Sequence, residues 1–98
     1  MIYLIATLKI KPDSFETIEK LVAPCIEGTR LEAGNISYDL FQSTTDKNTL
    51  SFVERWKDQA AIDNHFTESH FLAWRDAGAE YILDKKLEII TPENIEQK

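Results

Sequence analysis

The stretch Leu50–Phe71, LSFVERWKDQAAIDNHFTESHF, changes its periodicity partway along and carries both histidines of the chain. The first part alternates, so one face of a predicted strand carries Leu50, Phe52, Glu54 and Trp56. From Asp58 the apolar residues recur every three to four positions, which predicts a helix that Asp58 caps. Glu54 therefore lies among large apolar side chains, where a buried carboxylate is costly unless it has a partner.

Three further segments are predicted to be strands. Met1–Lys11 is largely apolar on both faces, Asn35–Gln42 alternates, and Leu83–Thr91 ends at Pro92. The small polar residues 43–48 form a turn between the second strand and the strand that begins at Leu50. These two strands are therefore expected to form an antiparallel hairpin.

A long amphipathic helix is expected between the first two strands. Asp13 is predicted to be its N-cap, with Glu16 in the capping-box position. The apolar stripe continues past Pro24, although a proline inside a helix removes a backbone hydrogen bond and predicts a kink or a split. Gly34 is expected to end this segment. Two charged residues before it are interpreted as an exposed helix end: Arg30 and Glu32.

The fold class follows from the order strand, helix, strand, strand, helix, helix, strand, in which Thr67 restarts the chain into the last helix. Four antiparallel strands with helices on one face make a ferredoxin-like α+β sandwich. Residues 1–92 are predicted to form this one domain, and residues 93–98 a polar tail. A chain of 98 residues buries only about 60–68% of its unfolded surface. A homodimer that covers the open sheet face is therefore expected.

Composition argues against several classes of function. The net charge is −6 and no basic cluster is present, which argues against a nucleic acid or an anionic membrane as partner. No apolar run approaches the ~20 residues of a membrane helix, and Met1 leads directly into a strand pattern, so a cytoplasmic location is expected. Cys25 is the only cysteine, so it is interpreted as a small buried apolar residue and not as a nucleophile.

The two histidines lie five positions apart. Five residues of an unbroken helix turn through about 500°, so His65 and His70 share a site only if the helix breaks near Thr67. Either is a candidate general base or substrate partner, and the alternative is a helix-end histidine bonded to a carbonyl or stacked on an aromatic ring. A metal would need a third ligand, for which Glu68 and Glu54 are nearest, and the spacing differs from that of a zinc-binding helix. No metal is predicted.

Two residues of the central strand have two interpretations each. Glu54 is either a carboxylate poised in a cavity by its apolar surroundings or a structural acceptor for Arg30, Tyr38 or His65. Trp56 is either a core residue or a donor that lines a pocket for a flat ligand. No glycine-rich phosphate loop is present. The residues alone therefore predict a small dimeric protein with a pocket.

Three runs of residues carry a resemblance to a known family: Arg30-x-Glu32-x-Gly34-Asn35-x-x-Tyr38, Phe52-x-Glu54-x-Trp56-Lys57-Asp58 and His65-Phe66-Thr67-x-x-His70-Phe71. Over nearly its whole length the sequence resembles the antibiotic biosynthesis monooxygenase domain, the family of small quinol monooxygenases. The resemblance implies a dimeric α+β barrel with a pocket between the sheet and the helices of each subunit. In many members it also implies oxidation of a quinol or polyphenol by O₂ without metal, flavin or haem, so no cofactor is expected.

The implied chemistry fits the residues. An electron-rich phenol passes an electron to O₂ more readily once it is deprotonated, so the protein need supply only a dry aromatic pocket, a base and donors for the anion. His65 is expected to accept or steer the phenolic proton and Glu54 to orient it, with His70 as a further candidate base. The residues expected to bind the small aromatic substrate are Tyr38, Phe52, Trp56, Phe66, Phe71 and Asn35.

The same resemblance extends to other functions. Gly34-Asn35 and Phe41-Gln42 resemble the branch that isomerises phosphorylated breakdown products of the autoinducer-2 signal, although that branch favours Tyr where this chain has Trp56, and no phosphate-binding nest is visible. Asn64-His65 resembles the haem-degrading members. A non-enzymatic module that sequesters a quinone or polyketide is the remaining alternative. Dependence on O₂ and product formation distinguish these functions.

Overall fold

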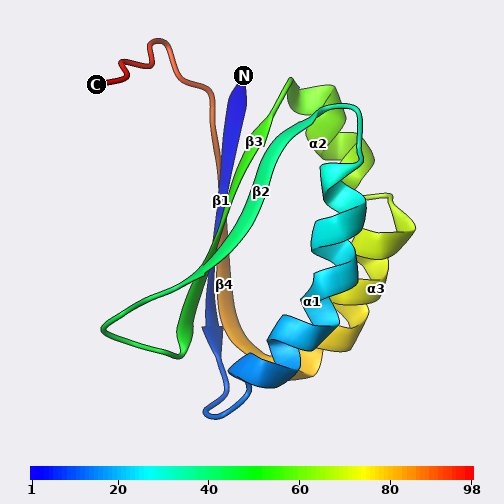
Figure 1. The fold of residues 1–98 in the computed structure, drawn as a ribbon, viewed down its shortest axis with the longest axis vertical. Helices are drawn as coiled ribbons and strands as arrows, with labels where there is room; N and C mark the ends of the chain where they lie inside the picture. The colour runs from blue at the N-terminus through cyan, green and yellow to red at the C-terminus, as the bar shows by residue number, and fades with distance from the viewer.

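The computed structural model describes residues 1–98, whose elements follow the predicted order (Figure 1). The strands are β1 (Ile2–Ile10), β2 (Asn35–Gln42), β3 (Thr49–Trp56) and β4 (Ile82–Ile90). The helices are α1 (Phe15–Arg30), α2 (Gln59–His65) and α3 (Ser69–Gly78), with a 3₁₀ turn η1 (Ala79–Tyr81) before β4. Residues 91–98 contain no helix or strand.

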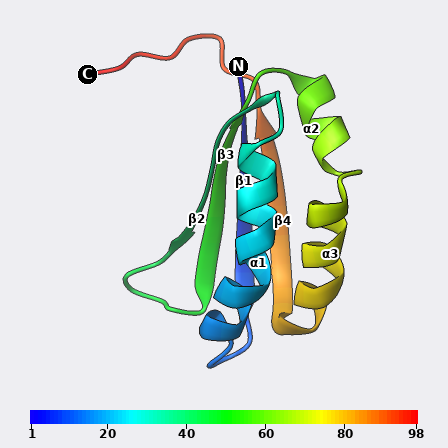
Figure 2. The same ribbon diagram turned by 45° about the vertical axis from the view of Figure 1, so that its right-hand side comes forward.

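The four strands form one antiparallel sheet in the order β2-β3-β1-β4. In the central strand β1, Leu4 lies opposite Glu54 of β3 on one side and Ile89 of β4 on the other. All three helices cover the same face of the sheet (Figures 1 and 2). The predicted ferredoxin-like α+β sandwich is therefore confirmed.

The core lies between the sheet and the helices. The alternation predicted for β3 is confirmed, because its buried side chains are Leu50, Phe52, Glu54 and Trp56. The central strand contributes Leu4, Ala6, Leu8 and Ile10. Helix α1 faces them with Ile18, Val22, Cys25 and Thr29. The alternate residues of the strands and the apolar stripe of the helix therefore pack together in one layer.

The other face of the sheet carries apolar side chains that no helix covers. Ile5 of β1 and Val53 of β3 are paired neighbours there, and both are only partly buried. Beside them, Tyr3 of β1 pairs with Ile90 of β4, which is 41% exposed. This is the face that the predicted homodimer would cover, and the dimer stays a prediction.

Helix α1 differs from the sequence-based expectation at both ends. Asp13 is not the N-cap, because its φ of 62° is left-handed, and the N-cap is Ser14. The helix also ends at Arg30, four residues before Gly34. Gly34 serves packing instead, since a Cβ there would collide with the Cβ of Ala61 in α2.

Pro24 does not split helix α1, which runs unbroken past it. The expected split is wrong because the side chain of Pro24 lies on the exposed side, where water can reach the carbonyl that lacks a partner. The opposite side of the helix packs on the sheet through Ile18 and Val22. Burial of this stripe outweighs the loss of one backbone hydrogen bond.

The two short helices begin where the sequence predicts. Asp58 caps α2, with its carboxylate accepting a hydrogen bond from the Ala61 amide at 2.9 Å. The chain breaks between His65 and Ser69, where α3 begins. None of the helices combines the length and apolar character needed to cross a bilayer.

Candidate functional site

A cavity of about 420 Å³ lies between the sheet and the α2–α3 side of the helical layer. Its sheet side is formed by Leu4, Ala6, Leu8, Tyr38, Phe52 and Glu54. The opposite side is aromatic and is formed by His65, Phe66, Phe71 and Trp74. Further lining residues include the charged side chains of Arg75, Asp84 and Lys85. The lining is mostly apolar, as expected for a small-molecule site, with a few polar groups.

Glu54 is a buried carboxyl group in the lining of this cavity, with only 4% of its surface exposed. Its Oε1 accepts a hydrogen bond from the indole Nε1 of Trp56 at 2.9 Å. Burial raises the pKa of Glu54 to about 7; the Trp56 hydrogen bond opposes this shift and the negative charge of Glu32 adds to it. At neutral pH the carboxyl group is therefore close to half protonated.

The hydrogen-bond donor to Glu54 differs from every donor considered from the sequence. Arg30 donates instead to the carbonyl of Tyr38 and to Asp39. The Tyr38 hydroxyl lies 3.7 Å from the sulfur of Cys25. The actual donor, Trp56, lies two positions along the same strand, where side chains share one face.

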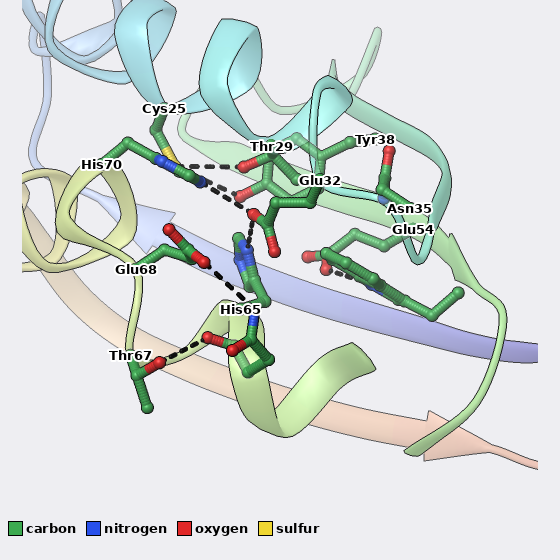
Figure 3. A network of polar contacts seen from close by, with 12 residues as sticks. Cys25, Thr29, Glu32, Asn35, Tyr38, Glu54, His65, Thr67, Glu68 and His70 are labelled. Carbon is green, nitrogen blue, oxygen red and sulfur yellow. Dashed lines mark hydrogen bonds and ion pairs between the residues drawn. The ribbon is translucent and has the colours of Figure 1, made fainter. Parts of the chain in front are cut away.

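His65 ends helix α2 and is only 1% exposed. Its Nδ1 lies 2.8 Å from Oε2 of Glu32, and Nε2 of His70 lies 2.7 Å from the same oxygen (Figure 3). We call Glu32, His65 and His70 the Glu32 trio. The break at Thr67 thus brings the two histidines together, with ring centroids 6.2 Å apart.

Glu32 is not the exposed helix end that the sequence suggested. Its side chain is 8% exposed and lies between the two imidazole rings (Figure 3). It is buried because α1 ends at Arg30 and the chain then turns towards α2. The sequence carries one signal for this site: a Cβ at Gly28 would come within 2.7 Å of Cγ of His70, so only glycine leaves room for that ring.

The three side chains of the trio are also of the kind that bind a metal, and their ligand atoms lie within 4.8 Å of one another. The contacts to Glu32 measure 2.7 and 2.8 Å, which are hydrogen-bond distances. A tetrahedral zinc ion at about 2.0–2.1 Å from each ligand holds neighbouring ligand atoms about 3.3 Å apart. The contacts are therefore those of two hydrogen bonds between the imidazole rings and one carboxylate oxygen.

The candidate ligands taken from the sequence, Glu68 and Glu54, are not part of the trio. Glu68 accepts a hydrogen bond from Asn64 at 3.1 Å, and Glu54 accepts one from Trp56. The acidic member of the trio is Glu32, which is far from both histidines in the sequence. Spacing along α2 and α3 could not identify it.

Burial sets the protonation of the remaining polar groups. It lowers the pKa of His65, although the Glu32 hydrogen bond and charge oppose this shift, so the ring is neutral at pH 7. Burial also raises the pKa of the Tyr38 hydroxyl, which therefore stays neutral. The pKa of the Cys25 thiol is likewise raised by burial, which agrees with its interpretation as a buried residue and not a nucleophile.

The structure brings six of the nine predicted site residues into the cavity lining: Tyr38, Phe52, Glu54, His65, Phe66 and Phe71. The other three lie outside it. Trp56 is fully buried, with its ring centroid 4.8 Å from that of His65. Asn35 donates to backbone carbonyls of Ser37 and Arg55, and His70 contacts the cavity only through the trio.

Comparison with known proteins gives consistent results. The family model described as antibiotic biosynthesis monooxygenase matches residues 1–77. The Bacillus subtilis protein named "Putative monooxygenase YcnE" is 34% identical over 93 residues, which cover 95% of this chain and 97% of that protein. The Mycobacterium tuberculosis protein named "Putative monooxygenase Rv0793" is 35% identical over 71 residues, 72% of this chain and 69% of that protein.

Two solved structures show the same fold. The structure of Rv0793 covers 98% of both chains with a TM-score of 0.88 and 27% identity. A Nitrosomonas europaea structure titled "Putative antibiotic biosynthesis monooxygenase" has a TM-score of 0.90 at 25% identity, with 96% of this chain and all of that chain covered.

Proposed function

The chain belongs to the antibiotic biosynthesis monooxygenase family, and on that premise we propose that its cavity is the active site of a monooxygenase. The substrate is a quinol or a polyphenolic, polyketide-like aromatic, and the oxidant is O₂. The reaction uses no metal or organic cofactor. The observation that carries the proposal is an apolar aromatic cavity of about 420 Å³ with His65 and Glu54 in its lining. This volume lies within the ~300–1,000 Å³ range of small-molecule sites.

Deprotonation of the substrate is the step that the protein must assist. A phenol or enol loses its proton to His65, and the resulting anion passes an electron to O₂ more readily than the neutral molecule does. For an anthrone, a ring CH₂ becomes a C=O; one atom of O₂ enters the product and the other leaves as water. The substrate supplies all four electrons, so the reaction needs no separate reductant.

The surrounding side chains support this step in distinct ways. Phe52, Phe66 and Phe71 make the lining apolar, so water competes poorly with the substrate there. Glu54, with its pKa of about 7, can either accept a hydrogen bond from the substrate or donate one to its anion. In this proposal His65 accepts the proton of the substrate, and Glu54 orients the substrate by a hydrogen bond.

We also propose that the active form is a homodimer. The open sheet face carries paired apolar residues such as Ile5 and Val53, and a second sheet stacked on it would remove them from water. The cavity lies on the opposite, helical side of the sheet, so dimerisation through this face leaves it free.

The test is oxygen uptake by chelator-treated protein with a panel of naphthoquinols and anthrones, compared with spontaneous autoxidation. The proposal predicts uptake well above autoxidation with at least one substrate, together with a product that carries one new oxygen atom: an anthraquinone from an anthrone, or a hydroxynaphthoquinone from a naphthoquinol. The matched control is His65→Gln, which retains a polar side chain but offers no imidazole base. Uptake equal to autoxidation across the panel contradicts the oxygenase, and activity that returns only on adding a metal contradicts the cofactor-free reaction.

A further inference from the structure

We infer that Glu32 is the positioning residue of this site: it holds His65 in the tautomer that keeps the proton on Nδ1 and leaves Nε2 free to accept a proton from a ligand in the cavity. His70 fixes the carboxylate from the other side. The catalytic meaning of this inference rests on the proposed function. The tautomer itself does not, because the contacts within the chain determine it.

The first step of the argument concerns the direction of the hydrogen bonds. An ionised carboxylate has lone pairs and no proton, so it can only accept. The nitrogens that face Oε2 of Glu32, Nδ1 of His65 and Nε2 of His70, must then both be donors. A neutral imidazole has a single N–H, so His65 with its proton on Nδ1 has a lone pair on Nε2.

The second step concerns where Nε2 of His65 lies. Nε2 of His65 has no hydrogen-bond partner in the chain. Among the side-chain nitrogen and oxygen atoms that are fully shielded from solvent, only Oε1 of Glu32 lacks a partner, so Nε2 of His65 is not one of the shielded atoms. Nε2 is therefore not sealed inside the protein. His65 lines the cavity and lies close to the rings of Tyr38 and Phe71, whose centroids are 5.5 and 5.0 Å from its own. The free lone pair is thus available to a ligand there.

The third step separates the candidate bases. His70 uses Nε2 to donate to Glu32, its ring packs against Gly28, and it does not line the cavity. Its role is to hold the carboxylate in place. Glu54 is engaged by Trp56 through one oxygen and shares the cavity with His65. The geometry therefore favours His65 over His70 as the proton acceptor, and Glu54 lies in the same lining, where it can orient the ligand.

The partnerless Oε1 of Glu32 suggests the most informative variant. In Glu32→Gln, the carbonyl oxygen can take the position of Oε2 and accept from both histidines, while the NH₂ group takes the position of Oε1. This variant keeps the hydrogen bonds and removes the charge. Glu32→Ala removes both, so the two variants separate orientation from electrostatic support of the protonated ring.

The experiment is long-range ¹H–¹⁵N NMR on the full chain labelled with ¹⁵N-histidine, without any substrate. At pH 7.5 the inference predicts that His65 carries its proton on Nδ1 in the wild type and in Glu32→Gln. In Glu32→Ala the Nε2–H form is expected to appear. Thermal unfolding by circular dichroism verifies that each variant is folded. If Glu32→Ala is not, Glu32→Leu provides the test, because it fills more of the same space and also offers His65 no acceptor.

Kinetics then test the consequence. Glu32→Ala should lower kcat about 10²-fold with a smaller change in KM, and Glu32→Gln should lose less, since a group acting through the base can remove no more than the base contributes. The acidic limb of the pH profile should shift in both variants.

The titratable groups around His65 come from every element packed against it. They are Glu32 after α1, Tyr38 of β2, Glu54 of β3, and Glu68 and His70 around the start of α3.

Several results overturn the inference. One is a wild-type His65 with its proton on Nε2. Another is Glu32→Ala with an unchanged tautomer and an unchanged kcat. Stoichiometric Zn²⁺ binding that shifts the resonances of both histidines would instead identify the trio as a metal site. If the proposed function is wrong but the inference is right, NMR shows the predicted tautomers while oxygen uptake does not exceed autoxidation.

Discussion

Replacing Glu54 with glutamine should stabilise the protein, and the gain should depend on pH. Glu54 is 4% exposed, and burial raises its pKa from 4.5 to about 7. Glutamine has nearly the same shape, and its carbonyl can still accept the hydrogen bond from Nε1 of Trp56. The variant therefore removes the cost of ionising a buried carboxyl group and leaves the packing intact.

The sign and size of the effect follow from the two pKa values. Below pH 4.5 the carboxyl group is protonated in both the folded and the unfolded chain, so it costs nothing. Between pH 4.5 and about 7 the unfolded chain loses the proton while the folded one keeps it, so the free energy of unfolding falls as the pH rises. Above pH 7 both are ionised and the cost is constant. At about 1.4 kcal/mol per pKa unit, it reaches about 3 kcal/mol.

The assay is urea unfolding of wild type and Glu54→Gln at several pH values from 4 to 8.5. The difference in the free energy of unfolding should be near zero at the acidic end and about 3 kcal/mol in favour of the variant at the alkaline end. Glu19→Gln on the exposed side of α1 is the control and should stay within about 0.5 kcal/mol throughout. A difference for Glu54→Gln that does not change with pH would refute the reasoning.

Three other changes test separate parts of the structure. His65→Ala should lower the turnover of an accepted substrate about 10²-fold or more, and an unchanged rate in the oxygen-uptake assay would remove it from the mechanism. Gly28→Ala should destabilise the fold by about 1–3 kcal/mol in urea unfolding, because the new Cβ would overlap His70; equal stability would mean that this ring moves freely. Ile5→Asp should convert a dimer into a monomer in sedimentation velocity, and a wild type that is already monomeric at micromolar concentration would contradict the dimer.

The features that local sequence patterns determine were predictable. Alternation placed Leu50, Phe52 and Trp56 on the buried face of β3, and it placed Glu54 among them. The cap at Asp58 and the restart after Thr67 also follow from neighbouring residues, and they bring the two histidines together. Period and capping chemistry operate over a few residues, so one sequence is enough to recognise them.

The features that distant contacts determine were not predictable. Gly28 is the one sequence signal near Glu32, and it does not identify Glu32 as buried, because the position of Glu32 depends on where α1 ends and on how Gly28 and Gly34 admit side chains of the other two helices. The start of α1 was missed for a different, local reason. Asp13 and Ser14 are both good capping residues, and the left-handed backbone of Asp13 decided between them.

The most direct test of the account is the fate of ¹⁸O₂ during turnover of an accepted anthrone by metal-free protein. Mass spectrometry should find one ¹⁸O atom in the quinone product and the other in water, and His65→Ala should reduce the labelled product about 10²-fold or more. A quinone without ¹⁸O, or labelling that is as fast without the protein as with it, would contradict the proposed monooxygenase.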